Sequence, residues 1–86
     1  MNQVTTVRVI RPYVIEVGFA DGVTRRVDVE PLLYGEMFEP LRDERLFDEA
    51  TVDEQLGTVV WPNGADLSPE FLYQERSQPV PSPDPR

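Results

Sequence analysis

The chain has 86 residues, no cysteine and no histidine, and a net charge of −8. Without cysteine it can form neither a disulfide framework nor a zinc–thiolate site, and without histidine it lacks the most frequent general base and transition-metal ligand. A chain of this length makes one small domain with little room for a deep pocket.

The negative charge is unevenly distributed along the chain. Residues 1–30 contain four arginines and four acidic residues, whereas residues 31–86 contain four arginines and twelve acidic residues. Such a surface repels nucleic acids and anionic lipids and attracts basic partners. The N-terminal residues lack the pattern of a signal peptide, and no apolar segment approaches the roughly 20 residues that span a membrane. We therefore expect a cytoplasmic protein without membrane association.

The first thirty residues have the pattern of a three-stranded antiparallel meander. Residues 4–10 are rich in β-branched side chains, and residues 13–19 alternate between the two faces of a strand. Asp21-Gly22 then predicts a hairpin in which both turn residues have positive φ, and residues 23–29 form the expected return strand.

Short helices and further strands are expected after the meander. Pro40 prevents one long helix between residues 36 and 50, so two helical turns are expected, with Asp43 as the N-cap of the second. Residues 51–55 and 58–61 are expected to be strands. The pattern predicts an α+β fold, with an antiparallel four- to five-stranded sheet and short helices packed on one face.

The last predicted helix begins at a strong local signal. Ser68 is a good N-cap and Pro69 suits the first helical position, so a short helix is expected to run to about Glu75. Residues 77–86 contain four prolines and are expected to be an extended or disordered tail. A single domain of residues 1–76 followed by this tail is therefore the predicted organisation.

No arrangement of residue types indicates an enzyme. Serine catalysis has no histidine to support it, and the glycines are scattered singly rather than gathered in a phosphate-binding loop. Six acidic residues lie close together in the sequence: Asp43, Glu44, Asp48, Glu49, Asp53 and Glu54. Their pattern does not match a calcium loop, and we interpret them as a solvated acidic face. We expect no catalytic residue, no cofactor and no metal ion.

Four arginines lie on neighbouring expected strands: Arg8, Arg11, Arg25 and Arg26. The negative field of the whole chain opposes nucleic-acid binding by this chain alone. Regulatory nucleic-acid binding within a complex is retained as an alternative function, and so is a small-molecule-binding domain.

The segment WPNGADLSPEFLY, residues 61–73, contains the chain's only tryptophan. A strand end, a turn and a capped helix account for its residues, with Trp61 in the core, and we favour this structural interpretation. The functional interpretation instead places Trp61, Asn63 and Asp66 on a contact surface, because tryptophan is also a frequent interface anchor.

The chain resembles a bacterial family catalogued as domain of unknown function 2442. The resemblance is carried by FADG, VDVEPLL, MFEPLRDERLF and, most specifically, GTVVWPNGADLSPEFLY, and it covers about residues 4–75. It implies a short α+β protein with no established activity, often encoded beside another small protein, with toxin–antitoxin pairing suspected. It identifies five signature residues without assigning them a role: Trp61, Pro62, Asn63, Gly64 and Asp66.

The charge asymmetry and the resemblance together predict a non-enzymatic protein-interaction module. Its expected partner is a small basic protein, such as a toxin held by an antitoxin-like chain. The expected partner-binding residues are Trp61, Asn63, Asp66, Asp43, Glu44, Asp48 and Glu49.

Overall fold

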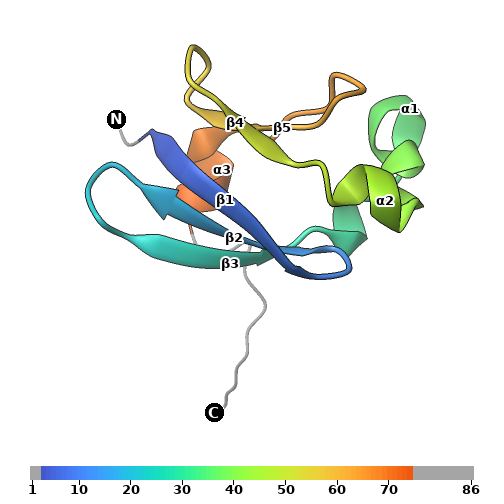
Figure 1. Ribbon diagram of the computed structural model, residues 1–86, viewed down its shortest axis with the longest axis horizontal. Helices are drawn as coiled ribbons and strands as arrows, with labels where there is room; N and C mark the ends of the chain where they lie inside the picture. The colour runs from blue at the N-terminus through green and yellow to red at the C-terminus, as the bar shows by residue number, and fades with distance from the viewer. Residues whose placement is uncertain (1–2, 75–86) are drawn as a thin grey trace.

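The structure, a computed structural model, describes residues 3–74 and combines two small antiparallel sheets with short helices (Figure 1). The elements in chain order are β1 (Val4–Arg11), β2 (Val14–Phe19), β3 (Thr24–Asp28), η1 (Glu30–Leu32), α1 (Gly35–Phe38), η2 (Glu39–Arg42), α2 (Glu44–Phe47), β4 (Thr51–Asp53), β5 (Thr58–Val60) and α3 (Pro69–Tyr73). The α+β class and the N-terminal meander β1-β2-β3 are confirmed. The predicted tail, residues 77–86, and the predicted helix end at Glu75 lie outside the described residues.

Within residues 3–74 the five strands form two sheets, of three and two strands, instead of the single sheet that was expected. β4 packs beside β1 but forms its ladder only with β5. One hydrogen bond of 2.9 Å, from the Val4 N–H to the Gly57 carbonyl, joins the start of β1 to the end of the β4–β5 turn. The pairing of β1 with β2 shifts in register near both ends of β1, as it does at β-bulges. In Figure 1 the β4–β5 hairpin accordingly crosses above the first sheet.

The first hairpin turns at Pro12 and Tyr13. Tyr13 has a φ of 70°, and a proline followed by a residue with positive φ is typical of a type II turn. The alternation of the sequence had placed Tyr13 inside the second strand, but that strand begins at Val14. The turn directs the Tyr13 ring onto Phe47, edge to face, with 5.4 Å between the ring centroids.

The second hairpin occurs at Asp21-Gly22 as predicted, but with a different turn. Only Gly22, at a φ of 91°, is in the left-handed region, so Asp21 does not have the expected positive φ. The N–H of Phe19 donates to the carbonyl of Val23, and the N–H of Gly22 donates to the carbonyl of Phe19. This is a three-residue loop, a type I turn closed by a glycine, rather than the predicted two-residue loop.

The core lies between the inner face of the first sheet and the segments that cross it. Its fully enclosed side chains come from both sheets, from the helices and from the loops, and the largest are Phe47, Ile15, Leu33, Leu41, Leu72, Val17, Val27, Val29 and Val59. Burial of side chains of this size is worth about 1.5–3 kcal/mol each and is the main force that holds the layers together.

Helix α3 closes one end of this core. Ser68 caps it, as the sequence predicted, by accepting a hydrogen bond of 3.0 Å from the N–H of Phe71, and Leu67 and Leu72 are both buried. Arg25, which interrupts the apolar face of β3, donates from Nε to the Tyr73 carbonyl at 3.1 Å. None of the helices between residues 3 and 74 is long and apolar enough to cross a membrane.

Candidate functional site

The candidate site is the acidic segment, residues 34–49, together with the turn of residues 62–64. The acidic segment contains α1, η2 and α2 in direct succession. Gly35, at a φ of 84°, turns the chain into α1, and Pro40 lies in the first turn of η2. The Asp43 carboxylate accepts a hydrogen bond of 3.0 Å from the N–H of Arg45 and begins α2, as predicted. Local signals therefore account for all three helices.

Each of these short helices is held by a side chain from elsewhere in the fold. The carbonyl groups in the last turn of a helix have no N–H donor within the helix, so they need donors from elsewhere. The three donor–acceptor pairs are Asn63 Nδ2 with the Met37 carbonyl at 2.8 Å, the Tyr13 hydroxyl with the Arg42 carbonyl, and Trp61 Nε1 with the Phe47 carbonyl at 2.9 Å. Two of the five signature residues therefore fix the acidic segment onto the sheets.

Trp61 is a core residue and only 2% exposed. Its ring centroid lies 5.6 Å from that of Phe47 and 6.2 Å from that of Phe38. A side chain so enclosed is not available to a partner at the surface, which corrects its inclusion among the expected contact residues. The physical reason is that the indole is large enough to fill the space beneath the acidic segment and also supplies a hydrogen-bond donor there.

Asn63 and Asp66 differ in what they do. Asn63 is half-buried, and its amide serves two internal hydrogen bonds, from Nδ2 to Met37 and to Oδ1 from the Ala65 N–H at 3.1 Å. Asp66 is exposed; its backbone bridges to Val60, and its carboxylate makes no hydrogen bond or ion pair within residues 3–74. Of Trp61, Asn63 and Asp66, which were expected together at a contact surface, Asp66 is the one whose side chain is exposed and makes no hydrogen bond or ion pair within residues 3–74.

The four predicted acidic residues, Asp43, Glu44, Asp48 and Glu49, are all exposed and all lie in the acidic segment. None of them forms an ion pair with another described residue; both ion pairs found among residues 3–74 belong to Glu16. Two large apolar side chains are also exposed here, Tyr34 at 70% and Met37 at 44%. Neither side chain was among the contact residues expected from the sequence, because the expectation rested on charge and on the turn that follows Trp61.

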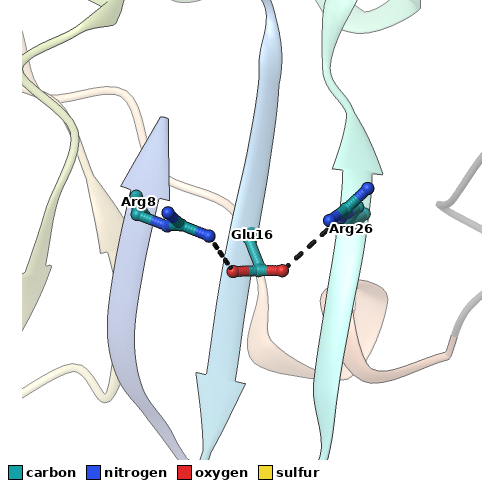
Figure 2. A network of polar contacts seen from close by, with 3 residues as sticks. All are labelled: Arg8, Glu16 and Arg26. Carbon is teal, nitrogen blue, oxygen red and sulfur yellow. Dashed lines mark hydrogen bonds and ion pairs between the residues drawn. The ribbon is translucent and has the colours of Figure 1, made fainter. Parts of the chain in front are cut away.

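The arginines of the alternative nucleic-acid surface do not form one patch. Arg8 and Arg26 flank Glu16 on the outer face of the first sheet and contact its carboxylate at 2.8 and 3.4 Å (Figure 2). The hydrogen bond from Arg8 is the largest cause that lowers the pKa of Glu16 below its ordinary value. Arg25 is turned the other way, with its guanidinium carbon 5.4 Å from the centroid of the Tyr73 ring.

No group of three or more acidic side chains within residues 3–74 is arranged so that it could hold a metal ion. The acidic segment therefore presents separate carboxylates to solvent instead of a convergent ligand set.

Comparison with known proteins identifies one family. A family model described as "Protein of unknown function (DUF2442)" matches residues 4–78, nearly the same range as the resemblance seen in the sequence. No curated protein and no solved structure matches the chain.

Proposed function

The chain belongs to the DUF2442 family of proteins of unknown function, and we propose that it is a non-enzymatic protein-interaction module. Its partner in this proposal is a small basic protein that docks on the acidic segment. The observation that carries the proposal is the combination of exposed, unpaired carboxylates with exposed Tyr34 and Met37 on one short segment. The absence of histidine and cysteine from the sequence supports a role outside catalysis.

Two physical effects favour this surface over the others. Carboxylates that are not paired internally attract a basic partner at long range and raise its association rate. Exposed apolar side chains such as Tyr34 and Met37 then supply contact area that is removed from water on binding. Because Tyr13, Trp61 and Asn63 hold the backbone of the segment, less conformational entropy is lost when the partner binds.

An antitoxin-like role is the specific form of this proposal that the family resemblance suggests. The basic partner would then be a toxin, and binding would block its activity. This form adds one requirement, namely that the chain relieves growth inhibition when the two proteins are expressed together.

The test starts with affinity purification of the full chain from its native cells at low and raised salt, with mass spectrometry of the proteins retained. The expected result is a stoichiometric basic protein that dissociates as salt rises, because salt screens exposed charges. Purified partner is then titrated against the triple variant Glu44→Gln, Asp48→Asn, Glu49→Gln. Asp43 is left unchanged because it caps α2.

A matched control variant removes the same number of charges outside the acidic segment: Asp28→Asn, Glu30→Gln, Glu70→Gln. We expect the triple variant of the acidic segment to bind at least tenfold more weakly than the control. Three neutralised contacts at about 0.5 kcal/mol each together reach the roughly 1.4 kcal/mol that corresponds to a tenfold change in Kd. Equal affinity in the two variants, or a chain that purifies without a partner at both salt concentrations, would contradict the proposal.

A further inference from the structure

A groove lies between the start of β1 and the turn of the β4–β5 hairpin. It has a volume of about 200 Å³ and is lined by Gln3, Val4, Thr5, Val52, Glu54 and Gly57. Sites for small-molecule ligands usually measure about 300–1,000 Å³, so this groove fits one long side chain better than a cofactor or metabolite. In Figure 1 the β4–β5 turn lies at the upper left and helices α1 and α2 lie on the right, so the groove is separate from the acidic segment.

The backbone around the groove is fixed by hydrogen bonds that leave Glu54 unused. The Asp53 carboxylate accepts the N–H groups of Gln55 and Leu56 at 2.9 and 3.0 Å and closes the turn. The Gly57 N–H donates to the Asp53 carbonyl at 2.7 Å. The Glu54 carboxylate makes no hydrogen bond or ion pair within residues 3–74, although the backbone that carries it is held on both sides.

Gly57 helps to keep the groove open. It has a φ of 67°, and a Cβ added at this position would lie 3.1 Å from Cγ of Gln3. Any other residue would therefore be strained in this conformation and would press on Gln3 at the wall of the groove. Leu56, next to it, is 57% exposed and adds apolar surface beside the opening.

The polar groups that line the groove are suited to a donor-only ligand. Among the residues that line the groove, Glu54 carries a carboxylate and Gln3 an amide with an acceptor oxygen, and the Thr5 hydroxyl donates its proton to the Gly18 carbonyl at 3.2 Å, which leaves the Thr5 oxygen as an acceptor. Half-buried Val52 provides apolar wall for an aliphatic stem, whereas the side chain of Val4 is only 2% exposed and packs in the core. A guanidinium has five N–H donors and no acceptor, and its planar fork matches a carboxylate.

We propose that this groove binds one arginine side chain of a partner polypeptide, with its guanidinium on Glu54 and its stem against Val52. The inference concerns a second surface and stands or falls independently of the proposed role of the acidic segment. A partner that used both surfaces would have to reach from one end of the β4–β5 hairpin to the other.

The experiment titrates the full-length, isotope-labelled chain with Nα-acetyl-L-arginine methylamide and follows the backbone amide signals by NMR. The expected result is a saturable shift of the amides of Thr5, Val52 and Gly57. The corresponding norleucine compound, which has a stem but no charge, is expected to give no saturable shift. The corresponding lysine compound is expected to bind several-fold more weakly, because an ammonium cannot form the bidentate contact.

Two variants locate the binding. Glu54→Gln is expected to weaken arginine binding at least fivefold, whereas Glu44→Gln, an equal loss of charge in the acidic segment, is expected to leave it unchanged. Shifts that do not saturate, or that are reduced equally by the two variants, would show diffuse attraction to an acidic protein and overturn the proposal. Equal binding of the lysine compound would overturn the assignment to arginine. Glu54 is exposed, so its replacement is expected to leave the fold intact. The dispersion of the amide signals in the variant's own spectrum verifies this.

Discussion

The side-chain nitrogen of Asn63 donates a hydrogen bond of 2.8 Å to the carbonyl of Met37, which lies 26 residues earlier in the chain. The loop of residues 62–64 has the same backbone hydrogen bonds as the loop of residues 20–22, since the N–H of Gly64 donates to the Trp61 carbonyl and the N–H of Trp61 donates to the Ala65 carbonyl. Asp21 has the equivalent position in the loop of residues 20–22, and its Oδ2 accepts a hydrogen bond of 2.8 Å from the Tyr73 hydroxyl. In both turns the side-chain Oδ1 accepts a hydrogen bond from the N–H two residues further on. Asn63 and Asp21 thus each close their own turn and also hold a distant helix. The Asn63 amide donates to a backbone carbonyl of α1, whereas the Asp21 carboxylate accepts from a hydroxyl of α3.

Replacing Asn63 by aspartate is expected to destabilise the fold by about 1–2 kcal/mol, because the carboxylate keeps the acceptor for the turn but loses the donor for the Met37 carbonyl. Asp21→Asn is the matched control and is expected to cost less, since its amide oxygen still serves the turn and its nitrogen can donate to the Tyr73 hydroxyl oxygen. Urea unfolding followed by far-UV circular dichroism measures both. Equal stability of Asn63→Asp and the native chain would show that the Met37 contact contributes nothing.

The elements that could be predicted from the sequence depend on residues a few positions apart. Asp43 caps α2 through the N–H of Arg45, and Ser68 caps α3 through the N–H of Phe71, so both signals are complete within four residues. The alternation of residues 13–19 likewise identified the buried face of β2, because side chains on a strand alternate between faces.

The contacts that assemble these elements could not be predicted in the same way. Trp61 reaches the Phe47 carbonyl across 14 residues, and Tyr13 reaches the Arg42 carbonyl across 29. Nothing in the sequence states which carbonyl an indole or a phenol will meet. The division into two sheets was missed for a related reason, since strand patterns identify strands but leave their partners open. The choice of asparagine at position 63 was the one available signal, because it adds a donor that the turn itself does not need.

The indole N–H of Trp61 gives a second test of how the acidic segment is held. Trp61→Phe is expected to lower stability by about 2 kcal/mol, because it removes both ring volume and the donor to the Phe47 carbonyl. That carbonyl retains a longer bond of 3.3 Å from the Ala50 N–H, which limits the loss. Tyr13→Phe removes a donor at a half-buried position and is expected to cost about 1 kcal/mol. A Trp61→Phe variant no less stable than Tyr13→Phe would contradict this account.

The ion pairs of Glu16 on the outer face of the first sheet are expected to make the free energy of unfolding depend on pH. Hydrogen bonds and charge from Arg8 and Arg26 lower the pKa of Glu16 in the folded protein, to below its ordinary value of 4.5. A lowered folded-state pKa means that the stabilisation is present above the unfolded-state pKa and is lost as pH falls through the folded-state pKa. The effect is roughly 0.5 kcal/mol, because both arginine side chains are more than half exposed and water screens them.

Glu16→Gln is therefore expected to lower the urea midpoint at about pH 7 and to differ less from the native chain as pH falls towards about 3, because the native carboxylate takes up a proton over this range and loses its interaction with the arginines. Arg8→Gln removes the largest cause of the pKa shift and is expected to flatten the pH dependence in the same direction. The measurement is a set of urea midpoints between these two pH values. Curves for the native chain and Glu16→Gln that stay parallel over the whole range would exclude a pKa shift of Glu16 as a source of acid sensitivity.

Gly18 lies on β2 between Thr6 and Thr24, its register partners on β1 and β3. A Cβ added at Gly18 would lie 2.6 Å from the Thr6 hydroxyl oxygen, closer than real atoms approach. Gly18→Ala is therefore expected to destabilise the native chain by about 1–2 kcal/mol, as overpacking does.

Within a Thr6→Ala background the clash is gone, and the same substitution is expected to stabilise by roughly 0.5 kcal/mol, because alanine suits a strand interior better than glycine. A Thr6→Val background keeps an atom at the clashing position and is not expected to rescue. Urea unfolding of the resulting double-mutant cycle decides the point, and an equal cost of Gly18→Ala in the threonine and alanine backgrounds would show that Thr6 does not set the space at Gly18.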